Sequence, residues 1–329
     1  MKTIDISLST ILKIILVPAV LLFTWNNRDI LFSLFLAFIL MSALRPFVIY
    51  LHVQKGVKRP IASALVFLTA LAIFILVLST IIPPLIFETI QFIEKLPVTL
   101  QSLDPAILRY IRLQEISQYV PDFANQAVNI VSNIFSNSFF VVTTLFFSYY
   151  FLVNEHNIDE KISKSVLAKN YSQEKIREWI RIVHVSQARL ASWFWGEVTL
   201  MTVVGVSSYI AFSVVGLKYA LPLAVLAGLL EAVPSIGPII AAIPAALIGF
   251  GQSPITGFAA IASSFIVQQL ENNLFVPYIM KKAVGLNPII TMISVVVGLR
   301  VGGPLGALLA IPTYVLFESI YVEYLKNRA

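Results

Sequence analysis

Long hydrophobic runs alternate with short polar segments along most of the chain. A helix that crosses a bilayer needs roughly 20 mainly apolar residues, and several runs reach that length. The run at 11–25 has no small-residue cleavage site after it, so we interpret it as a retained helix and not as a signal peptide. We expect spanning helices at residues 9–26, 30–51, 60–84, 134–154, 193–216 and 255–279.

Two further apolar stretches, at 219–252 and 287–321, are interrupted in their middles and form an internal repeat. In each stretch a proline, Pro222 or Pro288, stands 15 residues before a Gly-Pro pair. Arms of about 14–18 residues measure roughly 21–27 Å, short of a bilayer core of about 30 Å. We therefore expect two helical hairpins that enter the membrane and turn back, although two ordinary kinked helix pairs are the alternative. The expected turn residues are Pro234, Gly237, Pro238, Gly303 and Pro304.

The polar segments have helical periodicity and complete the expected organisation. Residues 83–97 and 174–190 each place apolar side chains on one helical face and charged ones on another. The predicted fold class is all-α: a polytopic membrane protein with about six spanning helices, two broken helical hairpins forming an inverted repeat, and amphipathic surface helices. The expected regions are N-terminal membrane helices at 1–84, an extracytoplasmic amphipathic region at 85–133, a membrane helix at 134–156, a cytoplasmic helical region at 157–192, and a C-terminal transport core at 193–329.

Composition and charge agree with a membrane protein and give it an orientation. Hydrophobic residues make up 58% and charged residues 12% of the chain, against about 45–50% and 25% in a typical soluble domain. With a cytoplasmic N-terminus, 17 of the 23 lysines and arginines fall inside and five outside, which follows the positive-inside rule. Both termini are then cytoplasmic, and the hairpins enter from opposite faces. Transporters with such inverted repeats bind their substrate near the midplane.

Ionisable and polar residues at membrane depth are the candidate site, because each is costly there unless it is used. Glu231 and Arg300 each precede a hairpin turn, and their opposite charges predict a pair; capping of two separate watery vestibules is the alternative. A polar patch in the 255–279 helix is expected to face a hydrated pathway, or else the cytoplasmic headgroups. Its residues are Gln268, Gln269, Glu271, Asn272 and Asn273. Glu197 is a candidate coupling residue or an interfacial carboxylate.

The sequence lacks the residues that metal binding, nucleotide hydrolysis or intramembrane hydrolysis would need. The chain has no cysteine and only three scattered histidines, so no metal site is expected. No G-x-x-x-x-G-K-[ST] phosphate loop occurs, and no serine or aspartate is placed for intramembrane hydrolysis. We expect no cofactor, no enzymatic activity and no nucleic-acid partner.

Three segments resemble the hallmark segments of the autoinducer-2 exporter family, also called PerM-like permeases. They are EAVPSIGPIIAAIPAALI (231–248), QQLENNLFVPYIMKKAVGLNP (268–288) and GGPLGALLAIP (302–312). The resemblance implies an oligomeric protein of the bacterial inner membrane with about eight membrane helices. Some members of the family are linked to export of autoinducer-2, and others to exchange of sodium or lithium for protons. Members often carry Gln where this chain has Glu197 and Asn where it has Arg45, and the extra carboxylate favours cation coupling.

The sequence therefore predicts a secondary transporter that moves a small polar solute or an autoinducer-2-like signalling molecule, coupled to an ion gradient. Glu231, Glu271 and Glu197 are the candidate coupling residues. A Na+(Li+)/H+ antiporter and a non-transporting membrane scaffold are the alternatives. A permease driven by a separate ATPase would need EAVPSIG (231–237) in the cytoplasm, where the predicted orientation does not place it. Expected partners are the lipid bilayer, a small solute or a monovalent cation or proton, and further copies of the chain.

Overall fold

The computed structural model describes residues 26–77, 138–164, 171–234, 237–283 and 288–326, with a few isolated positions. Within these ranges every regular element is a helix, which confirms the predicted all-α class. Four helices are long and apolar enough to cross a membrane: Arg28–Gln54, Arg59–Val77, Gln173–Val215 and Ile289–Lys326. The predicted 9–26 helix and the 85–133 region lie almost wholly outside the described residues.

The N-terminal part of the fold is a packed group of three helices. Helix α2 (Arg28–Ile49) continues through a π-helical turn, η1 (Tyr50–Gln54), and the helix Arg59–Val77 follows. Helix α6 (Ser138–Asn154) packs against α2. Their shared core contains the buried residues Met41, Val48, Ala62 and Leu152. The short turn η2 (Glu155–Asn157) and helix α7 (Ile158–Ser163) come after α6.

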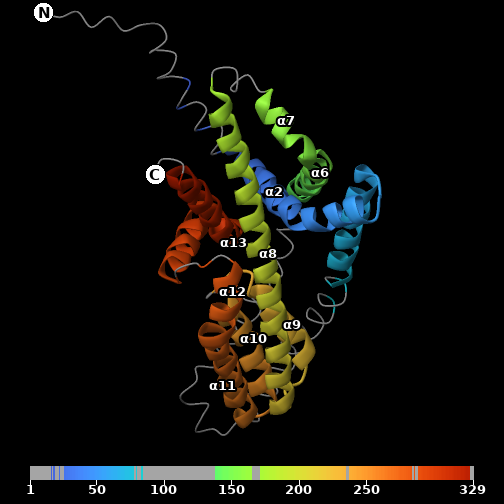
Figure 1. Cartoon of the computed structure of the whole chain (residues 1–329). Coiled ribbons are helices and arrows are strands. Elements are labelled where there is room, and N and C mark those ends of the chain that lie inside the picture. Colours follow the sequence, from blue (N-terminus) through green and yellow to red (C-terminus); the bar gives the residue numbers. More distant parts are fainter. Residues whose placement is uncertain are drawn as a thin grey trace, which may run out of the picture.

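Helix α8 (Gln173–Val215) is the longest straight element and runs the length of the molecule (Figure 1). Its 43 residues extend about 64 Å at 1.5 Å per residue, about twice the thickness of a bilayer core. Ser172 caps its start by accepting a hydrogen bond from the Lys175 amide, and Gly216, with φ 71°, ends it. No proline interrupts it, so the polar segment before residue 192 and the predicted span at 193–216 form one continuous helix.

The first predicted hairpin is present as helix α9 (Ala220–Leu230) followed by α10 (Gly237–Gln252), and the two arms contact each other. A Cβ at Gly237 would lie 1.8 Å from the Leu230 carbonyl oxygen, so only glycine allows this close turn. Helix α11 (Pro254–Leu270) then returns along α10. It continues through a π-helical turn, η4 (Glu271–Phe275), into helix α12 (Val276–Ala283).

The second predicted hairpin is present within α13 (Pro288–Lys326), which is broken at Gly303. That residue has φ 61° and ψ −147°, a conformation essentially reserved for glycine. A Cβ at Gly298 would lie only 2.3 Å from the Gly306 carbonyl oxygen. In a straight helix these residues would be about 12 Å apart. The first arm (288–302) and the second arm (304–326) are therefore folded back on each other.

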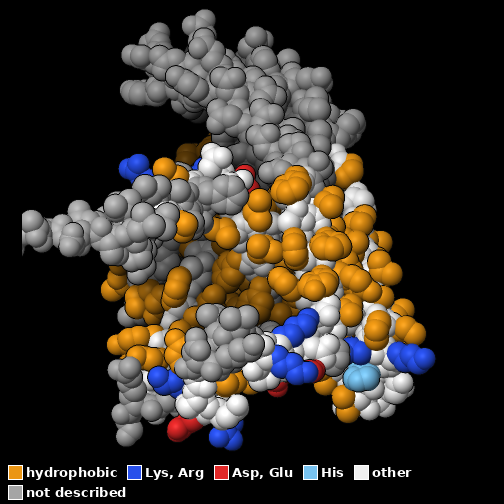
Figure 2. Space-filling model, turned by 90° about the horizontal axis from the view of Figure 1, so that it is seen from above, with side chains coloured by type: hydrophobic (Ala, Val, Ile, Leu, Met, Phe, Trp, Pro, Cys, Tyr) orange, Lys and Arg blue, Asp and Glu red, His pale blue; other side chains and the backbone are white. Residues whose placement is uncertain are grey.

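The exterior of the molecule is largely apolar. Figure 2 shows hydrophobic side chains over much of the face in view, with most of the visible lysines and arginines in its lower part. Exposed apolar residues occur on every long helix, among them Phe74, Val206, Val214 and Phe317. An exposed surface of this kind is what a helical protein presents to lipid.

Candidate functional site

Three carboxylates from three separate elements are buried in the interior. Glu197 lies on α8, Glu231 follows the last residue of α9 at the hairpin turn, and Glu271 begins η4. Their exposed fractions are 4%, 0% and 3%. Glutamate is almost never buried to this extent without a partner, so the burial of three glutamates together is unusual. We refer to Glu197, Glu231 and Glu271 as the carboxylate cluster.

The members of the carboxylate cluster face one another. The three carboxyl groups are near enough to interact electrostatically: Glu271 with both of the others, and Glu197 with Glu231. Ionised carboxylates only accept hydrogen bonds, so a hydrogen bond between Glu231 and Glu271 would need a proton on one of them. Gln268 supports this arrangement by donating from Nε2 to Glu271 Oε1 at 3.2 Å.

The cluster has no cationic partner in the part of the chain that the structure describes. No lysine, arginine or histidine of that part forms an ion pair with any of the three residues. Both oxygens of Glu197 and both oxygens of Glu231 lack hydrogen-bond partners there. Carboxylate oxygens in this state can take up a proton or a small cation.

The predicted pair between Glu231 and Arg300 is absent. Arg300 is exposed and forms no ion pair with a described residue. The first arm of α13 turns Val295 inward, and Arg300 follows five residues later, about 140° around the helix. Arg300 therefore points away from the interior. The prediction was wrong because it placed Arg300 by its distance from the turn and not by the packed face of its helix.

The side chains of the polar patch at 268–273 do not all face the same way: some point into the interior and others to the outer surface. Glu271 is buried and Gln268 half-buried, whereas Gln269, Asn272 and Asn273 are exposed. Asn273 Nδ2 donates to the Gln269 carbonyl oxygen at 2.9 Å on that outer side. The π-helical turn η4 begins at Glu271, and such turns are frequent at functional sites. Only two of the five patch residues therefore contribute to the cluster.

The predicted turn residues of the two hairpins differ in their relation to the carboxylate cluster. Pro234 lies in the turn that begins at Glu231, and Gly237 and Pro238 open α10 directly after it. Gly303 and Pro304 form the break in α13. The hairpin turn of α9 and α10 thus supplies a member of the carboxylate cluster, and the break in α13 does not.

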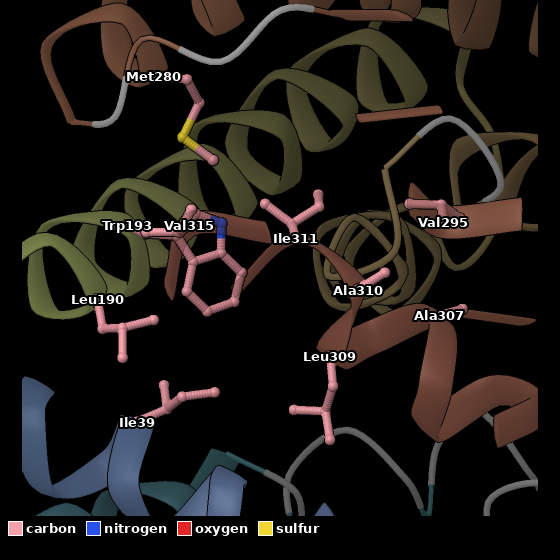
Figure 3. Packing of buried hydrophobic residues seen from close by; sticks show 10 residues of the cluster. All are labelled: Ile39, Leu190, Trp193, Met280, Val295, Ala307, Leu309, Ala310, Ile311 and Val315. Carbon is pink, nitrogen blue, oxygen red and sulfur yellow. The ribbon is translucent and has the colours of Figure 1, made fainter. Parts of the chain in front are cut away.

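A hydrophobic cluster seals the interior beside the carboxylates. Val233, two residues after Glu231, packs against a core formed by α2, α8, α12 and α13. Figure 3 shows the Trp193 indole of α8 among Leu190, Leu309 and Ile311. Trp193 precedes Glu197 by one helical turn, so this core excludes water from one approach to the cluster.

A small pocket lies on another side, between α8, α9, α10 and α11. Most of its lining is apolar, and its polar residues are Ser208, Ser264 and Gln268. Gln268 therefore borders the pocket and also bonds Glu271. The described residues contain no group of side chains suited to hold a metal ion. The sequence analysis missed Ser208, although it follows Glu197 by 11 residues, which places both on the same face of α8.

Long apolar helices, two broken hairpins and buried ionisable groups are features that membrane transport proteins share. The comparisons with known proteins agree. The sequence model of the AI-2E family transporters matches residues 12–326, and the chain belongs to this family.

Three relatives indicate how far the similarity reaches. YueF of Bacillus subtilis (strain 168) is 26% identical over 70% of this chain and 59% of its own length. YrrI of the same strain is 23% identical over 91% of this chain and 86% of its own. PerM of Escherichia coli (strain K12) is 32% identical over 40% of this chain and 38% of its own. The names of YueF and YrrI describe candidate transport proteins, and that of PerM a candidate permease.

Proposed function

We propose that this protein is a secondary transporter that couples movement of a small polar solute to a proton gradient. The carboxylate cluster is its proton-binding site. One observation carries the proposal: Glu197, Glu231 and Glu271 are buried together with no cationic partner among the described residues. An autoinducer-2-like signalling molecule is the solute suggested by the family, and export is the proposed direction.

The energetics of burial support a functional role for the cluster. One charged side chain in the centre of a spanning helix costs on the order of 2.5–3.5 kcal/mol on insertion scales, and a favourable pairing would normally offset it. Here three acidic groups accumulate instead, near enough to interact electrostatically with one another. Such a site is stable when it holds protons and unstable when it loses them, which is the property a proton carrier needs.

The proposed setting is the bacterial cytoplasmic membrane, with several passes and both termini in the cytoplasm. The distribution of lysine and arginine supports that orientation. In this orientation the α9–α10 hairpin enters from outside and the α13 hairpin from the cytoplasm. Association of several copies in the lipid bilayer is part of the same proposal, and the extensive apolar exterior is compatible with it.

Exchange of sodium or lithium for protons is the second candidate. The unpartnered oxygens of Glu197 and Glu231 favour it, because monovalent cations bind carboxylate and carbonyl oxygens. A cation would then replace the proton shared by Glu231 and Glu271. In both candidates the same cluster binds the coupling ion, and the candidates differ in what else is moved.

Flux measurements on purified protein in liposomes test the proposal. Autoinducer-2, Na+, Li+ and H+ are each offered under an imposed pH gradient, with the wild type, Glu271→Gln and Glu160→Gln compared. Glu160 is exposed and pairs with Lys164, so its variant controls for the loss of one carboxylate. We expect gradient-driven flux in the wild type and in Glu160→Gln, and a loss of at least tenfold in Glu271→Gln. Equal flux in all three proteins contradicts the assignment, and no flux of any solute supports a scaffold.

A further inference from the structure

Glycines join the helices around the pocket into two pairs. A Cβ at Gly228 of α9 would lie 2.6 Å from the Met201 carbonyl oxygen of α8 and 3.2 Å from the Gly205 Cα. A Cβ at Gly249 of α10 would lie 2.9 Å from the Gly257 Cα of α11. Helix backbones that touch through glycine pack closely within a membrane. Helices α8 and α9 therefore form one tightly joined pair, and α10 and α11 form a second.

The pocket follows the seam between these two pairs. The first pair contributes Val204, Ser208, Phe212 and Ala227, and the second contributes Pro238, Ala241, Ala242, Ser264, Val267 and Gln268. The carboxylate cluster is divided in the same way. Glu197 and Glu231 belong to α8 and the end of α9, whereas Glu271 continues α11. One seam thus contains both the pocket and the contact between Glu231 and Glu271.

Ser208 is the unusual residue of this seam. Its side chain is 3% exposed and lines the pocket. Ser264, across the pocket, donates to the Ala260 carbonyl oxygen at 2.9 Å. A buried hydroxyl group that borders a pocket can bond to water held there. Ser208 lies eight residues before Gly216, about 12 Å from the end of α8, and about 16 Å from Glu197.

We propose that this seam is a water-filled inlet through which protons reach Glu271 from the side of the membrane where α8 ends. Ser208, Ser264 and Gln268 are its polar steps, and the inlet opens when the two glycine-joined helix pairs separate. The lining contains no ionised side chain, which suits water and protons. This inference rests on the proposed proton-coupled function. It adds the route that the protons take and the two helix pairs that move apart.

Cysteine labelling tests the inlet, because the chain has no cysteine of its own. The thiolate is the form of cysteine that attacks thiol reagents, and it forms in water and not in lipid. Ser208→Cys is compared with Val206→Cys, which is 54% exposed on the apolar outer face of α8. A membrane-impermeant cationic methanethiosulfonate is added to right-side-out and to inside-out vesicles. The reagent is larger than water, so reaction at residue 208 also requires the seam to open.

We expect Ser208→Cys to react at least tenfold faster than Val206→Cys, and from one side of the membrane only. Faster reaction at residue 206, or protection of residue 208 from both sides, would overturn the inlet. Ser264→Cys repeats the comparison from the other helix pair. Labelling does not depend on transport, so an unreactive residue 208 refutes the inlet whether or not the protein moves protons.

Proton flux links the inlet to the cluster. We expect Ser208→Leu, which fills the pocket, to slow proton flux at least tenfold, and Val206→Leu to leave it unchanged. Ser208→Ala, which removes the hydroxyl group without added volume, should slow it about threefold. Unchanged flux in both Ser208 variants would show that the seam is not the proton route. Absence of proton flux in the wild type refutes the proposed function instead, and leaves the labelling contrast as it is.

Discussion

Glu155 holds together the N-terminal helices, and its replacement by glutamine should destabilise the protein strongly. The buried Glu155 carboxylate forms an ion pair with Arg45 Nε at 2.6 Å and a second with Arg59. These contacts join the ends of α2 and α6 to the start of the helix Arg59–Val77. Glu155→Gln would leave both guanidinium groups without their counter-charge while it keeps the size of the side chain.

The expected loss in the free energy of unfolding follows from the burial of the Glu155 ion pairs. Breaking a buried ion pair costs about 3–5 kcal/mol, whereas an exposed pair contributes about 0–1 kcal/mol. The Arg45 side chain is 26% exposed and regains some hydration, and glutamine still accepts one hydrogen bond. We therefore expect a loss of about 2–3 kcal/mol in the free energy of unfolding. Glu160→Gln, five residues further on and exposed, should cost no more than about 0.5 kcal/mol.

The assay is denaturant unfolding of purified protein in detergent micelles, followed by the fluorescence of its four tryptophans. The two variants are compared with the wild type under the same detergent and salt. If Glu155→Gln falls within about 0.5 kcal/mol of Glu160→Gln, the buried ion pairs do not stabilise this helix group, and the reasoning from burial is refuted.

Three further predictions concern the hairpins and the cluster. Gly303→Ala should lower the free energy of unfolding by about 1–3 kcal/mol, because alanine is strained at the positive φ of this position. Equal stability of the variant and the wild type would contradict this prediction. Arg300→Gln should change liposome flux less than twofold, since its side chain is exposed; a severe loss would revive a role for Arg300 at depth. Gln268→Leu removes the donor to Glu271 and should slow proton flux at least threefold, whereas Asn273→Ala on the outer side should not.

The repeat of the two hairpins was accessible from the sequence because local chemistry determines it. Gly237 permits the close approach of two backbones, and Gly303 adopts a positive φ. Each turn therefore depends on the presence of glycine at a single position, which can be read from the sequence. The structure bears out both chain reversals for this reason. The arm lengths were predicted less well, because α9 has only 11 residues and the second arm of α13 extends over 304–326.

The carboxylate cluster was only partly predictable. Glu231 and Glu271 were recognised as costly at depth, and Glu197 as a candidate coupling residue or an interfacial carboxylate, but the expected partner of Glu231 was the oppositely charged Arg300. In the structure Glu231 contacts Glu271, 40 residues away in the chain, and no local pattern encodes that approach. The π-helical turn at Glu271 also changes which side chains face inward. Ser208 was missed because a lone serine in an apolar helix is common and carries no signal until its neighbours are known.

Proton flux through a double-mutant cycle tests the central claim most directly. Liposomes containing the wild type, Glu231→Gln, Glu271→Gln or the double variant are given the same pH gradient, and proton movement is followed with an entrapped dye. If the two residues share one proton, each single variant should lose at least tenfold, and the double variant should lose no more than the singles, because the second change removes nothing further. Unchanged flux in either single variant, or losses that multiply in the double variant, would contradict a shared proton site.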